Sequence, residues 1–271
     1  MRGSSRAAAL AGSKALDAAL AGGVDRSRLG DELLAVATTI DGSATLRRAL
    51  ADPSREGSDK AALAERLLTG KVTPETVVVV KNLAGQRWAA ERDLPDTVEE
   101  LGISAVLAGA EQASRIDRVE DELFRFERTV AANPELRDAL TNRQGDPQAK
   151  AELVQRLLEG KTAPETLRLA RQAVLAPRGR KLDRTLEAYL ALAAQRREQV
   201  TAVVTVAHDL TAQQRERLAA ALQNIYGKPV QLQQVLDPHV MGGIRVQVGD
   251  EVVDGTVLRR LDEARRHITG S

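Results

Sequence analysis

The stretches RLLTGKVTPET (residues 66–76) and RLLEGKTAPET (residues 156–166) are two versions of one phrase, separated by 90 positions. In each version a run with helically spaced apolar residues ends before a glycine, Gly70 or Gly160, and a proline follows four residues later. Glycine favours the left-handed conformation that closes a helix, and proline favours the first turn of the next helix. The phrase therefore predicts a helix, a tight turn and a second helix.

The second version also contains Gly160-Lys161-Thr162, which resembles the close of a phosphate-binding loop. Such a loop needs a glycine five positions earlier, where this chain has Gln155, and it should follow a buried strand. Instead, the residues before Gly160 have helical spacing, and Thr162 and Glu165 have the spacing of a capping box. We therefore favour the helix–turn–helix interpretation over a nucleotide site, and we expect no cofactor.

The repeat extends well beyond the quoted phrase. A shift of 90 residues aligns residues 31–76 with residues 121–166 without a gap, and 19 of the 46 aligned pairs are identical. Two unrelated helical stretches would not keep one register over this length, so the chain contains an internal duplication. The identical residues are mostly apolar positions and helix caps. What was duplicated is therefore a fold rather than a reaction centre.

Apolar spacing and capping signals divide both copies into short helices. In copy one the expected helices cover residues 7–21, 25–40, 44–50, 58–69, 74–88 and 92–112. In copy two they cover residues 115–131, 134–140, 147–158, 164–176 and 180–198, and the helix over 92–112 serves both copies. We predict a mainly α protein with two helical bundles, residues 1–112 and 113–199, followed by a small α+β domain, residues 200–271.

The α+β prediction rests on a change of pattern after about residue 200. Strands are expected over residues 200–206 and 229–236, around Ile244, Val246 and Val248, and over 251–253, with a helix over 211–226 and another after 254–256. Thr211 is a candidate N-cap of the first helix. Gly242-Gly243 suits a tight entry into the third strand, and Gly249-Asp250 suits a two-residue hairpin turn.

Composition excludes several classes of function. The net charge is only +1 and aromatic residues make up 2% of the chain, so neither a basic field nor a base-stacking platform recruits nucleic acid. Cysteine is absent, and the sequence contains no apolar run long enough for a membrane span and no signal core. The three histidines, His208, His239 and His267, lack metal-ligand spacing. We therefore expect no catalytic residue and no metal site.

Two arginine clusters are interpreted as surface features. Arg178-Gly179-Arg180 has the chemistry to grip a phosphate or an acidic partner, but a solvated turn is the favoured interpretation. Arg196-Arg197-Glu198, near the end of an expected helix, is likewise expected in solvent.

Residues 176–222 and 226–266 resemble the delta subunit of the F-type ATP synthase, known in mitochondria as the oligomycin-sensitivity-conferring protein. The most specific part of the resemblance is the order and spacing of Asp237, Gly242, Gly243, Ile244, Gly249, Asp250, Asp254 and Gly255. Residues 132–143 and the caps at Gly160 and Pro164 resemble the helical bundle of that family. An ordinary member has one bundle, whereas this chain carries nearly two, as the longer actinobacterial delta subunits do.

The resemblance implies a non-catalytic stator subunit in the peripheral stalk, at the cytoplasmic face of the cell membrane. In this family the bundle binds N-terminal helices of alpha subunits of the catalytic head, and the C-terminal domain binds the b subunits. The motif residues from Asp237 to Gly255 are thus implied to shape a domain that docks the b subunits. The alternative is a helical-repeat adaptor or chaperone, although such an adaptor should contain three or more copies.

A comparison of the two versions of one helix predicts which copy binds the head. At about 100° per residue, Val78, Lys81, Gly85 and Trp88 share one side of the helix over 74–88, next to an unbroken apolar run. The equivalent residues of copy two, Arg168, Arg171, Leu175 and Arg178, are expected to face water. The four copy-one residues are therefore the predicted head-binding side, with Trp88 as its fluorescent reporter. The alternative is that this side packs against copy two.

Overall fold

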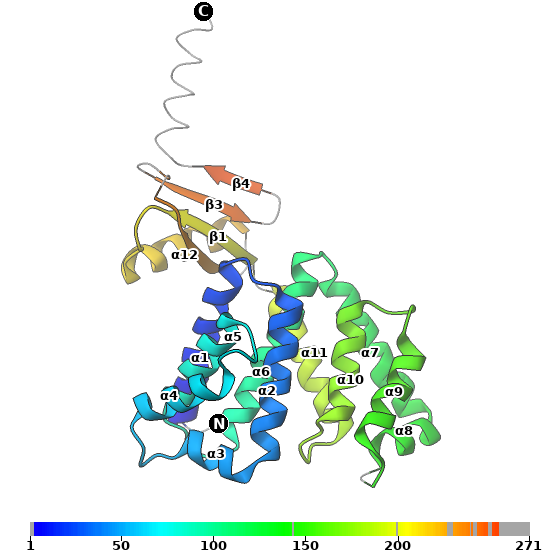
Figure 1. Ribbon diagram of the computed structural model, residues 1–271. Helices are drawn as coiled ribbons and strands as arrows, with labels where there is room; N and C mark the ends of the chain where they lie inside the picture. The colour runs from blue at the N-terminus through cyan, green and yellow to red at the C-terminus, as the bar shows by residue number, and fades with distance from the viewer. Residues whose placement is uncertain are drawn as a thin grey trace, which may run out of the picture. The chain divides into compact units, whose positions relative to one another are not determined.

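The computed structural model describes residues 3–142, 144–198, 200–226, 230–238, 240, 243–248 and 251–254. The chain divides into two compact units, a helical unit of residues 1–20 and 24–197 and a C-terminal unit of residues 21–23 and 198–271. Figure 1 shows the helical unit as helices only and the C-terminal unit as a small sheet with one labelled helix. The predicted fold class, mainly α with a small α+β C-terminal part, is confirmed.

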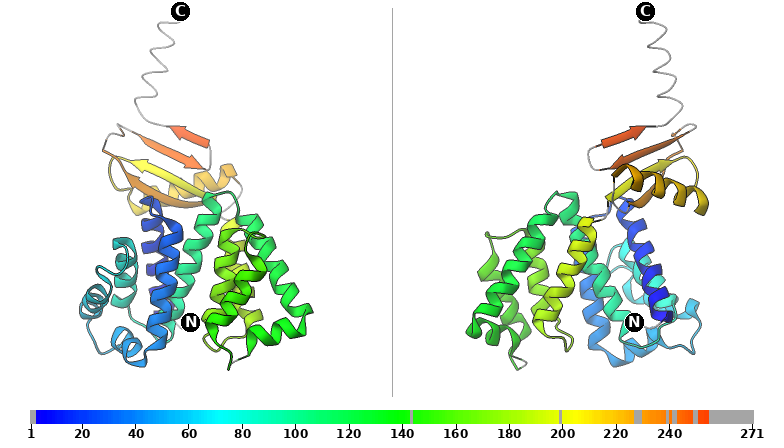
Figure 2. Two further views of the ribbon diagram at one scale, coloured as in Figure 1. Left: turned by 45° about the vertical axis from the view of Figure 1, so that its right-hand side comes forward. Right: turned by 180° about the vertical axis from the view of Figure 1, so that it is seen from behind.

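The helical unit contains eleven helices in the described residues. They are α1 (Gly3–Ala21), α2 (Arg26–Gly42), α3 (Ala44–Ala51), α4 (Gly57–Leu68), α5 (Pro74–Gly85), α6 (Asp93–Gln112), α7 (Ile116–Ala132), α8 (Pro134–Thr141), α9 (Pro147–Leu158), α10 (Pro164–Leu175) and α11 (Leu182–Glu198). Helices α2 and α6 run between the other helices of copy one and those of copy two (Figure 2).

Each copy encloses a hydrophobic core, and the two cores are built from equivalent positions. The core of copy one includes Leu29, Leu33, Leu50, Val79 and Leu83, and that of copy two includes Val119, Leu123, Leu140, Leu169 and Ala173, each 90 residues later. Helix α6 contributes Leu94, Val98 and Leu101 to the first core and Ile103, Val106 and Leu107 to the second. This helix therefore belongs to both bundles, as the sequence predicts.

The duplicated phrase forms the turns α4–α5 and α9–α10. Gly70 and Gly160 have φ angles of 77° and 72°, the left-handed region in which a Cβ is strained, and Pro74 and Pro164 begin the following helices. The Gly-Lys-Thr stretch therefore ends a helix. The expected capping box is wrong, because the Thr162 hydroxyl donates to the carbonyl of Leu158.

A carboxylate from the neighbouring helix caps α5 and α10 instead. One oxygen of Glu32 accepts hydrogen bonds from the Thr73 N–H at 2.9 Å and from the Thr76 hydroxyl at 2.6 Å. Ninety residues later, Glu122 accepts from the Ala163 N–H at 2.8 Å and from the Thr166 hydroxyl at 2.6 Å. Because the first N–H groups of a helix lack partners within it, these carboxylates fix α5 against α2 and α10 against α7.

The C-terminal unit contains β1 (Val200–Val206), α12 (Ala212–Tyr226), β2 (Val230–Leu236), β3 (Ile244–Val248) and β4 (Glu251–Asp254). The sheet has the order β2-β1-β3-β4, with β2 parallel to β1, and the neighbours β1–β3 and β3–β4 antiparallel. Ala202, Val204, Val206 and Val246 pack with Leu222 of α12. Thr211 caps α12 in a capping box with Gln214, as expected. The expected terminal helix lies outside the described residues.

Candidate partner-binding site

The predicted head-binding residues are placed in two different environments. Val78 is 58% exposed on α5, although it is an apolar residue in the middle of a helix. Beside it, the ammonium group of Lys81 lies 2.7 Å from a carboxylate oxygen of Glu65 on α4. Gly85 is half-buried, and its carbonyl approaches Gly57 so closely that a Cβ there would clash. We call Val78, Lys81 and Gly85 the α5 face.

Trp88 does not belong to the α5 face. Helix α5 ends at Gly85 rather than at residue 88, and the Trp88 side chain turns into the core of copy one, where it is 4% exposed. Its indole N–H donates to the carbonyl of Leu83 at 3.0 Å and so satisfies one of the last carbonyls of α5. The expected single stripe of four residues is therefore wrong at its last member.

Among the copy-two equivalents of the four predicted residues, two arginines lie at the junction of the two copies. Arg168 of α10 lies 2.6 Å from a carboxylate oxygen of Asp31 on α2, and Leu175 packs against the core of copy two. The side chain of Arg178 is 4% exposed and lies 3.3 Å from Asp96. The expectation that this side of copy two faces water is wrong at Arg168 and Arg178, because each is paired with an acidic residue of α2 or α6, and Arg171 is partly buried.

The arginine clusters singled out in the sequence are also paired within the chain. Arg178 and Arg180 both approach Glu99 of α6, whose side chain is 1% exposed. Arg196 lies 2.7 Å from Glu111 and is largely buried, whereas Arg197 lies 3.2 Å from Glu120. Arg178, Arg180 and Arg196 were expected in solvent. Instead, Arg178 and Arg180 connect copy two to Glu99 of α6, and Arg196 connects α11 to Glu111 of the same helix.

The buried Glu99 carboxylate changes the pKa values of two neighbouring side chains at this junction. Burial lowers the pKa of the Arg180 guanidinium, but the nearby Glu99 carboxylate outweighs it and leaves that pKa raised. Burial, followed by the Glu99 charge, raises the pKa of the Tyr189 phenol beside it. A buried ion pair in a low-dielectric setting resists separation, because removal of one partner leaves an uncompensated charge. The two copies are thus locked by charge as well as by apolar packing.

The equivalent helices α5 and α10 therefore have different surroundings. Copy two uses its α10 to contact copy one, whereas Val78 on the equivalent α5 remains exposed. Copy two does not cover Val78, so the alternative in which this side is buried within the chain fails at that residue. Val78 therefore remains accessible to a partner, whereas its equivalent Arg168 is used within the chain.

The C-terminal motif residues are only partly described. Asp237 donates its backbone N–H to the carbonyl of Val206, Gly243 leads into β3, and Ile244 pairs with Val206 across β1 and β3. Asp254 ends β4 opposite Arg245. The motif residues Gly242, Gly249, Asp250 and Gly255 lie outside the described residues.

Exposed apolar side chains mark the edges of this unit, which the sequence did not single out. Leu236 lies at the end of the edge strand β2, Val252 on the edge strand β4 and Ile225 near the end of α12, and all three are exposed. Edge strands offer unpaired backbone groups, so apolar side chains on them favour a protein partner. A branched apolar residue on an edge strand would have indicated such a site. The sequence did not reveal it, because the order of the strands in the sheet decides which strands are edges.

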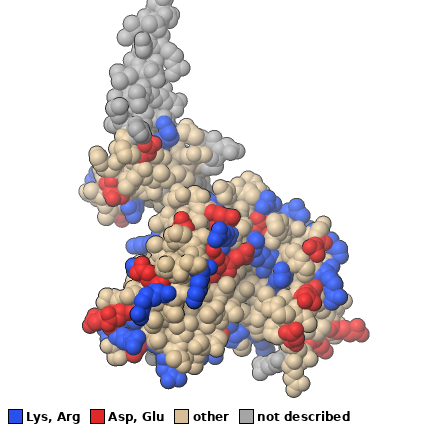
Figure 3. All heavy atoms as spheres, viewed as in Figure 1, with Lys and Arg blue, Asp and Glu red and all other residues tan. Residues whose placement is uncertain are grey.

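The described surface has no charged patch of one sign over the helices in view, because acidic and basic side chains are interspersed (Figure 3). In the described ranges no group of three or more His, Cys, Asp or Glu residues has the arrangement of a metal site. None of the described helices is long and apolar enough to cross a bilayer.

These features define a duplicated helical scaffold, followed by a small α+β unit, that presents surfaces for protein partners. The family model described as "ATP synthase delta (OSCP) subunit" matches residues 104–268. The chain therefore belongs to the ATP synthase delta (OSCP) subunit family.

Full-length relatives agree with this assignment. The chain is 48% identical to the ATP synthase subunit delta of Kineococcus radiotolerans, over 99% of this chain and 98% of that protein. It is 46% identical to the ATP synthase subunit delta of Streptomyces griseus over the whole of both chains. A chain of the mitochondrial ATP synthase hexamer of Toxoplasma gondii matches 61% of this chain and 94% of its own length, but its TM-score of 0.27 and 20% identity are too low to support an argument.

Proposed function

We propose that this protein is a peripheral-stalk subunit of an F-type ATP synthase, which links the catalytic head to the b subunits and catalyses no reaction itself. The observation that carries the proposal is family membership over the whole length. Rotation driven by protons forces ATP release only if the head is held still, so the subunit acts through binding alone. Its place is the cytoplasmic face of the membrane, as a peripheral part of the complex.

The α5 face of copy one, together with the adjacent α1, is the proposed contact with an N-terminal helix of an alpha subunit. Val78 is exposed, and α1 packs next to α5 through the buried Gly12, which lies close to Leu83. Lys81 and Glu65 at its edge offer both signs of charge. An amphipathic helix binds to such a surface through apolar residues spaced three or four apart.

The C-terminal unit is the proposed contact with the b subunits. Its exposed Leu236 and Val252 lie on the two edge strands, where an added helix or strand finds both apolar side chains and unpaired backbone groups. The motif residues around Gly243 and Ile244 shape the hairpin that carries one of these edges.

Affinity purification from detergent-solubilised membranes tests both contacts. We expect tagged wild-type protein to retain alpha and b subunits, Val78→Arg to lose alpha but keep b, and a Leu236→Asp/Val252→Asp variant to lose b but keep alpha. Ala149→Arg, on the exposed side of α9, is the matched control and should retain both. Wild-type protein that retains neither subunit would contradict the stalk role.

A further inference from the structure

The junction between the copies is a head-to-tail contact, in which different surfaces meet. Copy one contributes Asp31 and Leu34 of α2 with Ile103 and Val106 of α6, which we call the α2/α6 face. Asp31 pairs with Arg168 of α10, and the three apolar residues belong to the core of copy two. A head-to-tail contact between two repeats leaves one surface of each kind uncovered, the α5 face of copy one and the α2/α6-type face of copy two.

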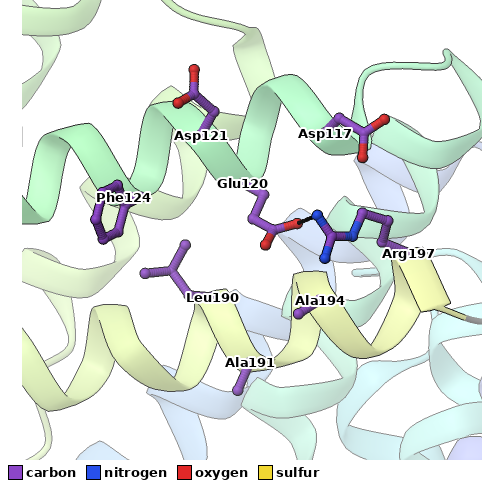
Figure 4. A pocket seen from close by; sticks show the side chains of 8 residues that line it. All are labelled: Asp117, Glu120, Asp121, Phe124, Leu190, Ala191, Ala194 and Arg197. Carbon is purple, nitrogen blue, oxygen red and sulfur yellow. Dashed lines mark ion pairs between the residues drawn. The ribbon is translucent and has the colours of Figure 1, made fainter.

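The second uncovered surface lies between α7 and α11. Residues 90 positions after Asp31 and Leu34 are Asp121 and Phe124. The core residues Leu182, Leu186 and Ala193 of α11 follow those of α6 by 88 positions, so Ala191 and Ala194 correspond to Ile103 and Val106. Asp121, Phe124, Ala191 and Ala194 all line one hollow of about 480 Å³, together with Asp117, Glu120, Leu190 and Arg197 (Figure 4).

The hollow exists because two glycines of copy one have no equivalent in copy two. A Cβ on Gly30 would lie 2.7 Å from Val106, and one on Gly102 would lie 2.9 Å from Leu34, so α2 and α6 pack in close contact. The corresponding residues of α7 and α11 are Glu120 and Leu190, whose side chains occupy the space between the helices. A hollow lies between α7 and α11, whereas the backbones of α2 and α6 pack in close contact at the equivalent positions.

The lining of the α7/α11 hollow combines an apolar floor with an acidic rim. The ring of Phe124 is 52% exposed and points toward Leu190 across the hollow (Figure 4). Asp117 and Asp121 stand on the same helix, and Glu120 is paired with Arg197 at 3.2 Å. Asp121 is paired with Arg125 of its own helix, but both side chains are largely exposed. Replacement of Arg125 by a cationic side chain of a partner therefore costs little free energy.

We propose that the α7/α11 hollow binds an amphipathic helix of a partner protein, with apolar side chains against Phe124 and Leu190 and an arginine or lysine against Asp121. The chain itself shows this chemistry on the equivalent surface, where α10 carries Arg168 to Asp31. A second copy of this chain fits poorly, because its uncovered α5 face has Val78 in place of that arginine. The inference does not depend on which larger assembly contains the protein.

Fluorine NMR of the full chain labelled with 4-fluorophenylalanine tests the proposal. The protein has two phenylalanines, the exposed Phe124 and the buried Phe126, so the second signal is an internal control. The probe is a capped peptide of residues 162–178, the helix used on the equivalent surface. We expect it to shift the Phe124 signal but not the Phe126 signal, and its Arg168→Glu version to bind about fivefold more weakly or worse.

Four outcomes would overturn the proposal. The first is no shift at millimolar peptide, and the second is equal binding of the charge-reversed peptide. A Phe124 signal that moves with protein concentration alone would identify a second copy as the occupant. A signal that moves when Arg259 and Arg260 are replaced by glutamate would identify the C-terminal residues of the chain itself. The probe is a peptide of this chain and no other subunit is present. A negative result therefore says nothing about the stalk role, and a negative result for the stalk role does not affect this test.

Discussion

Arg168 of α10 lies 2.6 Å from Asp31 of α2, and the residues 90 positions away from each have been freed from that pairing. Position 78 carries valine instead of arginine, and Asp121 pairs with Arg125 on its own helix. The two copies therefore differ at this contact, because copy one lacks the arginine and the Asp121 of copy two pairs within its own helix.

The buried junction should be worth far more than the exposed one. We expect Glu99→Ala to lower the free energy of unfolding by about 3–5 kcal/mol, because Arg180 loses the carboxylate to which it donates and the buried Arg178 keeps only Asp96 as a partner. Arg168→Ala should cost no more than about 1 kcal/mol, since the Arg168–Asp31 pair is partly exposed. Urea unfolding followed by far-ultraviolet circular dichroism measures both. Equal costs for the two variants would contradict the lock at Glu99.

The close contact of α2 with α6 depends on Gly30. A Cβ there meets Val106 at 2.7 Å and the Gly102 carbonyl at 3.2 Å, so Gly30→Ala should destabilise the protein by about 1–3 kcal/mol. Gly109→Ala in α6 is the matched control, because its Cβ would meet only Arg26 at 3.7 Å. That variant should be neutral or gain up to about 1 kcal/mol from helix propensity. Thermal unfolding of both variants measures these changes in stability. A Gly30→Ala variant as stable as the wild type would contradict the close contact of α2 with α6.

The cap formed by Glu32 makes stability depend on pH in the acid range. Burial alone raises the pKa of Glu32, but hydrogen bonds from Thr76 and Thr73 outweigh it and lower that pKa from 4.5 to about 2. A lowered folded pKa means that the stabilisation is complete above about pH 4.5 and is lost as the pH falls toward 2. Glu32→Gln should therefore cost about 1–3 kcal/mol at pH 7 and progressively less between pH 4.5 and 2.

Urea midpoints at a series of pH values measure this effect, and Glu135→Gln, on the exposed surface of α8, controls for the change in net charge. The duplicated cap at Glu122 should behave in the same sense. Burial raises its pKa, whereas hydrogen bonds from Thr166 and Arg118 lower it below the ordinary value. A difference between wild type and Glu32→Gln that stays constant down to pH 2 would show that the carboxylate does not carry the cap.

Trp88 should report on folding rather than on binding. Because its indole is 4% exposed and bonded to Leu83, we expect blue-shifted emission in the isolated protein and a red shift only on unfolding. A peptide from the alpha N-terminus should leave this emission nearly unchanged. A large blue shift on adding the peptide would mean that Trp88 is exposed before binding, contrary to its place in the core.

The sequence predicted the features whose signals are local. Gly70, Gly160 and the prolines after them mark helix ends through backbone preferences, and the 90-residue register aligns core positions such as Leu33 and Leu123. The β-branched run at residues 200–206 likewise predicted a strand without any knowledge of its neighbours. These elements follow from residues close together in the chain.

The errors came from contacts between distant residues. Arg178 has the appearance of a solvated turn residue until Asp96 and Glu99, about 80 positions earlier, are placed beside it. The sequence spacing of Trp88 continues the helical series of Val78 and Gly85, but α5 ends three residues before Trp88. One clue was available in the duplication, because Glu32 and Glu122 are identical together with Thr76 and Thr166. A polar pair that is identical in both copies of a repeat predicts a contact, just as identical leucines predict core positions.

The most direct test of the stalk role is the coupling ratio, proton pumping per ATP hydrolysed, in membrane vesicles stripped of this subunit. Stripped vesicles should hydrolyse ATP with little pumping, wild-type protein should restore the ratio, and Val78→Arg should restore it poorly while the matched control Ala149→Arg restores it fully. Full pumping without the subunit, or a ratio that wild-type protein fails to raise, would contradict the proposed function.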